Sequence, residues 1–399
     1  MRTTYRDIFL LACCQALLLV NTSGLITVNG LVGYSLAGDK AFATAGVTSY
    51  VLGSALSAMP AALWMAKVGR RRGFMMASLL AVAGSGICAL ALAWSSFALF
   101  CLGTAIMGIY TAVGLQYRFA AAEVAAPEFR AKAISLVLAS GIVGGFLGPE
   151  VTRWGRALLP TPFLGSFVVL AAIALVALGV QSRVRVPAPR TAASGGGRPL
   201  REIARQPVFV VAALSAALGY GIMNLLMTAT PLAMSFCGYP FAAAAFVIEW
   251  HVVGMYAPGF VTGTLIQRFG ALKVIAWGTL LMAACVAVAL ADNRIVHFWF
   301  ALVLLGVGWN LMYTGGTALL AEAYTPAERA KTQGLNDLII FAVMGVSSFA
   351  SGALIDAAGW GSMNAVALPF IAVVALATAW LAMLRQRPAT PRARPPQRG

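Results

Sequence analysis

The hexapeptide PEFRAK at Pro127–Lys132 returns as PAERAK at Pro326–Lys331, 199 residues later in a chain of 399 residues. In each copy an arginine stands three residues after the proline and a lysine five residues after it. A glutamate also precedes each proline by four residues, as Glu123 and as Glu322. A charged motif that recurs half a chain apart predicts a structural unit that the protein uses twice.

The composition around these hexapeptides indicates a membrane protein. Hydrophobic residues make up 60% of the sequence and charged residues 10%, whereas soluble domains carry roughly a quarter charged residues. Runs such as FVVLAAIALVALGV at 167–180 lie in segments long enough to cross a bilayer at about 20 residues per helix. Lipid cannot satisfy open backbone groups, and the alternation typical of a membrane barrel is missing. We therefore predict an all-α polytopic membrane protein.

Twelve apolar segments can be counted, and they form two sets of six. Their predicted bounds are 8–36, 42–66, 74–93, 97–121, 131–153, 163–181, 207–235, 241–266, 272–291, 295–321, 331–356 and 362–384. The hexapeptides follow the fourth and the tenth span. A second echo, KVGRRRG and QRFGALK, follows the second and the eighth span and aligns Gly69 with Gly270. We predict two pseudo-symmetric six-helix halves at 1–181 and 207–384, a basic linker at 182–206 and a disordered basic tail at 385–399.

Lysine and arginine are distributed unevenly between alternate loops. The side of both termini holds 24 of them, with Arg118 counted at the end of span four, and the other side holds four. Because positive loops stay in the cytoplasm, both termini are expected there, in a bacterial inner membrane. The net charge of +16 then reflects topology and contact with anionic lipid headgroups, and we expect no nucleic-acid partner. The six cysteines show neither metal-ligand nor disulfide spacing, so they are expected to be packing residues and no metal is expected. No cofactor is expected either.

The chain resembles the major facilitator superfamily over essentially its whole length. The resemblance rests on twelve spans, the long basic central loop and a loop after span two that is similar to the family's GxxxDRxGRR motif. The matching positions are Lys67, Gly69, Arg70 and Arg71 in the first half and Gly263, Arg268 and Gly270 in the second. The acid with which the family latches one conformation is replaced by Ala66 and by Gln267. The resemblance implies gating roles for this loop.

Span five carries GGFLGP, with Gly144, Gly148 and Pro149. It resembles the GxxxGP element of the family's antiporter groups, although EVTRW replaces the paired glycines that usually follow. This resemblance implies a hinge and favours efflux.

Polar and aromatic side chains near mid-span are candidates for a substrate cavity. Spans one, four, seven and ten line the central cavity in the superfamily, so the resemblance implies a binding role for residues in three of them. These candidates are Gln15, Asn21, Tyr220, Asn224, Trp309, Asn310 and Tyr313. The alternative for each polar residue is an interhelical hydrogen bond, worth about 0.6 kcal/mol.

Three ionisable residues are predicted at membrane depth, where charge is costly and indicates function. Glu249 and His251 stand two residues apart in span eight, so about 200° separates them around a helix and they face different neighbours. Asp337 lies about two turns inside span eleven. We name all three as proton-coupling candidates, with packing as the alternative for His251 and a gate or packing contact for Asp337.

These features predict a monomeric secondary transporter that moves a small organic solute by alternating access, coupled to protons and with a preference for efflux. The alternative is an uptake permease for a small metabolite or vitamin-like compound, such as a flavin, which would suit the tryptophans and tyrosines. A second alternative is a membrane receptor or scaffold that does not transport. The sequence carries no GxxxxGK[ST] loop and no HExxH or CxxC arrangement, so neither an ATP-driven pump nor an enzyme is expected.

Overall fold

The computed structural model describes residues 2–39, 42, 45–186 and 197–386, and this part of the chain contains helices and no strand. The first half holds α1 (Arg2–Leu36), α2 (Ala45–Val68), α3 (Arg70–Ala93), α4 (Phe97–Gly114), α5 (Tyr117–Val124), the 3-10 turn η2 (Pro127–Phe129), α6 (Arg130–Ala139), α7 (Gly141–Arg156) and α8 (Leu164–Gln181). The second part holds α9 (Leu200–Ala204), α10 (Pro207–Phe236), α11 (Phe241–Tyr256), α12 (Gly259–Phe269), α13 (Ala271–Ala291), α14 (Ile295–Leu320) and α15 (Arg329–Gln386).

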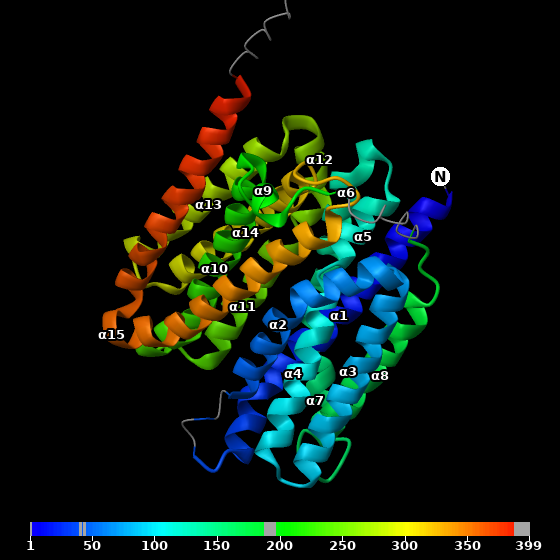
Figure 1. Cartoon of the computed structure of the whole chain (residues 1–399). Coiled ribbons are helices and arrows are strands. Elements are labelled where there is room, and N and C mark those ends of the chain that lie inside the picture. Colours follow the sequence, from blue (N-terminus) through cyan, green and yellow to red (C-terminus); the bar gives the residue numbers. More distant parts are fainter. Residues whose placement is uncertain (1, 40–41, 43–44, 187–196, 387–399) are drawn as a thin grey trace, which may run out of the picture.

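The twelve predicted spans are confirmed, because twelve helical segments are long and apolar enough to cross a membrane. Spans four, five and eight are each interrupted, between α4 and α5, between α6 and α7, and between α11 and α12. Spans eleven and twelve share α15, which turns at Gly359, where φ is 71°. Both ends of the described chain lie at one end of the bundle, at the top of Figure 1, and we call this the terminal side.

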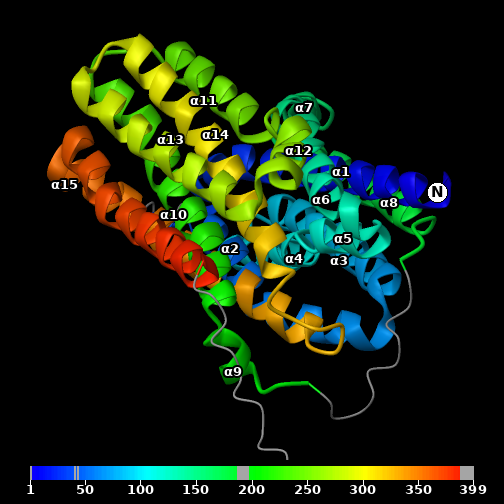
Figure 2. The ribbon, with the colours of Figure 1, turned by 90° about the horizontal axis from the view of Figure 1, so that it is seen from above.

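The predicted duplication is visible in the helix contacts. In the first half span one packs on span five (α1 on α7), span two on span four (α2 on α4) and span three on span six (α3 on α8). In the second half α10 packs on α15, α11 on α14 and α13 on α15, which repeats the pattern six spans later. Seen from above, the two halves stand side by side (Figure 2). They meet where α2 packs on α15 and α6 on α12.

The two echo loops have the same backbone. Gly69 has φ 90° and ψ 152°, and Gly270 has φ 86° and ψ 154°. Side chains disfavour a positive φ, so glycine is the residue that fits this turn. Each glycine precedes the next helix, α3 or α13. The hexapeptides also match, since Arg130 begins α6 and Arg329 begins α15.

The described end of the linker is fixed to the second half. Residues 187–196 and 387–399 of the predicted linker and tail lie outside the described residues. Arg198 donates to the two carboxylate oxygens of Glu328 from its backbone N–H at 2.8 Å and from Nε and Nη2 at 2.8 and 2.7 Å. Glu328 is buried, and the Arg198 guanidinium holds the pKa of this carboxyl well below its usual range. The short helix α9 follows, with Ile203 buried.

This linker contact should stabilise the protein above the usual carboxyl pKa of about 4. Arg198→Gln is expected to lower the melting temperature at neutral pH, because Glu328 stays buried without its cation. The folded pKa of Glu328 is depressed, so the pair's contribution is lost as the pH falls towards that pKa. The difference between wild type and variant should therefore shrink in acid. Thermal unfolding across pH checks this, and Glu328→Gln added to Arg198→Gln should cost little more. A difference independent of pH would contradict the ion pair.

Candidate functional site

A buried ion pair joins the two halves at the interruption of span four. Arg118 follows the break between α4 and α5, is fully buried, and donates from Nη2 to Asp337 Oδ1 in α15. Gln116 Nε2 donates to Asp337 Oδ2 at 2.6 Å, and Asn336 Nδ2 to Oδ1 at 3.2 Å. The Asp337 carboxylate therefore receives donors from both halves, in an environment where an unpaired charge would be costly.

The position of Arg118 corrects the sequence analysis, which counted it among the loop charges. Its guanidinium lies over the rings of Phe119 and Tyr313, at 4.6 and 4.5 Å from their centroids. Burial between two rings and one carboxylate keeps it out of solvent. The signal was present in the sequence, because Gln116 and Arg118 interrupt an otherwise apolar span.

A second layer of polar contacts lies around Arg70, closer to the terminal side. Arg70 is buried and donates to Gln116 Oε1 at 2.7 Å, to Glu123 Oε1 at 2.8 Å and to Gln333 Oε1 at 2.5 Å. Arg329 of the second half lies 3.2 Å from Glu123 Oε2. Glu123 therefore binds arginines from both halves. It provides Arg70 with a carboxylate, although the acid of the loop motif itself is replaced by Ala66.

We call these eight residues the polar cluster: Arg70, Gln116, Arg118, Glu123, Arg329, Gln333, Asn336 and Asp337. Further contacts between the halves lie nearby. Ser135 Oγ donates to the Gly259 carbonyl and accepts from the Gly263 N–H at 2.9 Å. Gln267 Nε2 donates to the Glu128 carbonyl. Figure 1 shows the helices of the two halves diverging towards the opposite side. The halves are thus joined by polar contacts at the terminal side.

Arg70 and its neighbour Arg71 should behave differently on substitution. Arg70→Ala removes a buried guanidinium that binds three side chains, and it should weaken the closed terminal side by about 2–4 kcal/mol. Arg71 is exposed, so Arg71→Ala should change little. Transport should slow in Arg70→Ala by tenfold or more, while equilibrium substrate binding stays within a few-fold of wild type. Transport rates and binding measured on both variants check this. Equal effects of the two changes would contradict the role of the buried contacts.

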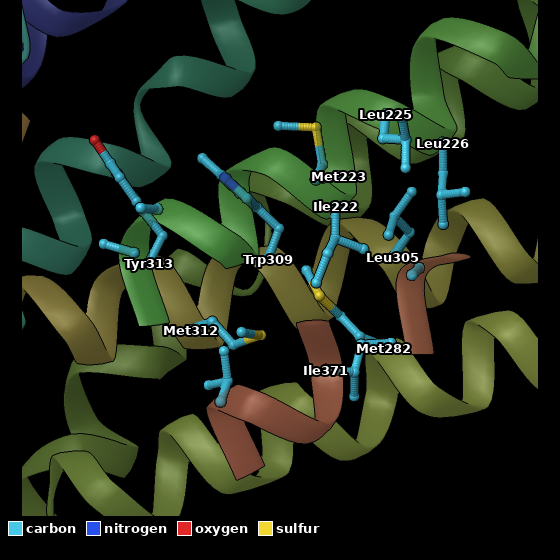
Figure 3. Close-up of a cluster of buried hydrophobic side chains, with 14 of the residues drawn as sticks. Ile222, Met223, Leu225, Leu226, Met282, Leu305, Trp309, Met312, Tyr313 and Ile371 are labelled. Carbon is cyan, nitrogen blue, oxygen red and sulfur yellow. The ribbon is translucent and has the colours of Figure 1, made fainter. Parts of the chain in front are cut away.

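Aromatic side chains gather beside the ion pair. Trp309 and Tyr313 of α14 stack with ring centroids 5.0 Å apart, and Tyr220 of α10 stands edge-on to them at 5.4 and 5.6 Å. Tyr256 of α11 stands edge-on to Trp309 at 5.9 Å. We call these four residues the aromatic cluster. Figure 3 shows Trp309 and Tyr313 at the edge of the apolar core formed by Met282, Leu305 and others, with their polar atoms directed away from it. Tyr256 was not among the sequence candidates, although it ends α11 just before the Pro258 break.

The amide candidates bond to neighbouring helices. Asn310 donates to the Met255 carbonyl and accepts from Thr262, both at 2.7 Å. Asn21 donates to the Leu170 carbonyl at 2.8 Å. Asn224 donates to Ser347 Oγ at 3.0 Å, and Gln15 is buried in α1. The structure thus brings together Tyr220, Trp309 and Tyr313, while Asn21 and Asn310 join helices within their own halves.

Glu249 and His251 face different surroundings. His251 is fully buried, and its Nδ1 lies 2.8 Å from the Leu302 carbonyl. Glu249 is exposed. It shares a face of α11 with Val252 and Tyr256, three and seven residues on. Those two side chains lie against Gly145 and Gly141 of the other half, so Glu249 is on the face of α11 turned towards that half.

The remaining loop candidates lie at the surface or in helices. Lys67 and Arg71 are exposed beside Gly69, and Arg268 lies over the Phe269 ring at 5.2 Å. Gly144 and Gly148 of α7 face α1, and Pro149 lies inside α7. Among the described residues, no group of three or more His, Cys, Asp or Glu side chains could hold a metal ion.

Comparison with known proteins identifies the family of this chain. The model of the Major Facilitator Superfamily matches residues 11–257 and 250–399. The chain is 40% identical over 373 residues to the riboflavin transporter RfnT of Brucella anthropi, covering 92% of this chain and 94% of the relative. It is 32% identical over 351 residues to the uncharacterized MFS-type transporter YdeG of Bacillus subtilis, covering 82% and 80%.

Solved structures share the fold at low sequence identity. The fucose:proton symporter FucP of Escherichia coli has a TM-score of 0.76 at 16% identity, covering 94% of this chain and 98% of that chain. The proton:xylose symporter XylE has a TM-score of 0.77 at 14% identity, covering 95% of each.

The two six-span halves and the polar contacts between them define a multi-pass integral membrane transporter. The chain belongs to the Major Facilitator Superfamily.

Proposed function

We propose that this protein imports riboflavin or a closely related flavin across the bacterial inner membrane. The proposal is carried by the 40% identity, over 373 residues, to a riboflavin transporter. The aromatic cluster supports it, because stacked rings suit a planar heteroaromatic substrate. As a transporter, the protein should leave the substrate chemically unchanged.

The similarity to a riboflavin transporter carries the proposed direction, and the closed side indicates which opening this conformation would present. If both termini lie in the cytoplasm, as the 24 to 4 charge asymmetry favours, the polar cluster closes the cytoplasmic side. Substrate would then enter from outside, and separation of the halves 1–181 and 207–384 at the polar cluster would release it inside. The similarity to a riboflavin transporter favours this uptake alternative over the preference for efflux that the GGFLGP element suggested.

Uptake tests the proposal directly. Cells that cannot make riboflavin should accumulate radiolabelled riboflavin when they express this chain, and excess unlabelled riboflavin should compete. Purified protein in liposomes should show the same uptake without ATP. Binding without flux would instead favour a receptor, and export of preloaded riboflavin without import would overturn the direction.

Glu249 is the proposed site of proton coupling, because it is an acid on the face of α11 turned towards the other half. Glu249→Gln keeps the shape and hydrogen bonding but cannot titrate. It should reduce flavin uptake driven by a pH gradient by about tenfold or more and preserve exchange of internal for external flavin. Glu150→Gln is the matched control, since Glu150 is an exposed acid paired with Arg153 at 2.5 Å. Unchanged pH-driven uptake in Glu249→Gln would leave His251 or Asp337 as the coupling residue.

A further inference from the structure

We propose that Arg118, Trp309 and Tyr313 form a recognition surface for the carbonyl edge of a planar heterocycle, with Asn336 accepting from the ring N–H between two carbonyls. This inference rests on the proposed function and names the part of the substrate that the site reads. It assigns substrate contact to Arg118 in addition to its ion pair with Asp337.

Several buried hydrogen-bond donors at and beside Arg118 have no acceptor. Arg118 binds Asp337 through Nη2, while its Nε and Nη1 have no hydrogen-bond partner. Trp309 Nε1 and Tyr313 Oη are also buried without a partner. A buried polar group without a hydrogen-bond partner destabilises the structure that contains it. Such groups in a folded protein require an explanation, and a ligand bound in another conformation would provide their acceptors.

These atoms lie on side chains that form one contiguous site. The Arg118 guanidinium lies 4.5 Å from the Tyr313 ring centroid, and that ring stacks on Trp309 at 5.0 Å. Asn336 donates to Asp337 at 3.2 Å, while its Oδ1 has no donor. Other buried atoms of the described chain also have no partner, and some of them, such as Tyr110 Oη and Trp299 Nε1, lie outside this site.

The recognition surface is covered in this conformation. Trp309 and Tyr313 are buried at 2% and 1% exposure, whereas Tyr220 is half-buried and stands edge-on to both rings. Tyr220 and Tyr256 thus pack against the recognition surface, and displacement of Tyr220 would open part of Trp309 and Tyr313 to a ligand. Span four is also interrupted beside this site, by a turn at residues 115–116 that separates α4 from α5.

The chemistry of the surface selects the ligand class. The unpartnered groups are N–H and O–H donors beside flat aromatic walls, with one amide oxygen as acceptor. A ring edge with the order carbonyl, N–H, carbonyl presents two acceptors around one donor and complements this set. Pyrimidinedione rings, including that of a flavin, carry such an edge. Because Arg118 also holds Asp337, a ligand on its free N–H groups would connect substrate binding with the contact between the halves.

The test compares variants that delete one donor and preserve the ion pair. Tyr313→Phe removes only the hydroxyl, and Trp309→Phe removes the indole N–H. Each should weaken riboflavin binding to the purified full-length protein about five- to twentyfold by isothermal titration calorimetry. The matched controls are Tyr110→Phe and Trp299→Phe, which delete unpartnered donors outside the surface and should leave the affinity unchanged.

A panel of ligands tests the recognition of the dione edge independently of whether riboflavin is the substrate. The panel is riboflavin, N3-methylriboflavin, lumichrome, uracil-type diones with a fused ring, and phenazine, which has no carbonyl. Dione ligands should bind, and N3-methylation should weaken binding about tenfold. Phenazine should bind weakly, with the same affinity for the wild type and for Tyr313→Phe. Riboflavin could show no binding while another dione binds and loses affinity in Tyr313→Phe as expected. In that case the proposed substrate is wrong and the recognition surface is supported. If phenazine binds as well as the diones, if no dione binds, or if the donor variants match the controls, the recognition surface is wrong.

Discussion

Asp337→Ala is expected to open the terminal side and to abolish net transport. The change leaves Arg118 fully buried without its carboxylate, and removing one partner of a buried ion pair costs about 3–5 kcal/mol. It also deprives Gln116 of its acceptor at 2.6 Å. Only the conformation closed at the terminal side makes these contacts, so its population relative to the open one should fall on the order of a hundredfold or more.

The opening can be measured as a distance. Spin labels can be placed at the exposed positions 71 and 273, in the first turns of α3 and α13, in a background without the six native cysteines. Asp337→Ala should lengthen the distance between the labels and reduce flavin uptake to near background. Asp292→Ala is the matched control, because Asp292 pairs with Arg294 at 2.5 Å on the exposed surface. Exposed pairs contribute about 0–1 kcal/mol.

A double variant separates charge from shape. Arg118→Leu combined with Asp337→Leu replaces the pair by apolar side chains, which is often neutral for stability. The label distance should return towards that of wild type, while uptake stays low because Arg118 is lost. If Asp337→Ala leaves the distance distribution unchanged, the ion pair does not hold the halves together.

Gly148→Ala is expected to disrupt the first half itself. A Cβ at Gly148 would lie 1.9 Å from Ser23 Oγ, 2.7 Å from the Val20 carbonyl and 2.8 Å from the Gly24 nitrogen. The Ser23 hydroxyl can rotate, although it would lose its bond of 2.7 Å to the Gly144 carbonyl. The two backbone atoms can move only if α1 and α7 separate. Such overpacking costs about 1–3 kcal/mol or more.

The readouts are the yield of folded protein and its melting temperature in detergent. Gly148→Ala should lower both. The control is Gly86→Ala inside α3, where a Cβ would meet no atom within 4 Å. Alanine at that helix position should be neutral or stabilising by about 0.5–1 kcal/mol. A Gly148→Ala protein as stable as wild type, but slow in transport, would instead support the hinge role that the GGFLGP element suggested.

The sequence by itself determined the twelve spans and their duplication. A span is predictable because lipid requires about 20 consecutive apolar residues, a property of contiguous sequence. The duplication was visible because turn glycines and helix starts are also local, as the positive φ at Gly69 and Gly270 illustrates. The aromatic candidates Tyr220, Trp309 and Tyr313 could be chosen because the family assigns their spans to the cavity.

Only the tertiary structure decided which charges are buried and what they bind. Arg118 and Asp337 are 219 residues apart, and Arg70 and Gln333 are 263 residues apart. No local pattern distinguishes the buried Arg70 from the exposed Arg71 beside it. The two side chains point in different directions around α3, and only the packing of the halves decides which direction faces a partner. The same holds for Gly148, because the space available to a side chain depends on how closely α1 approaches α7.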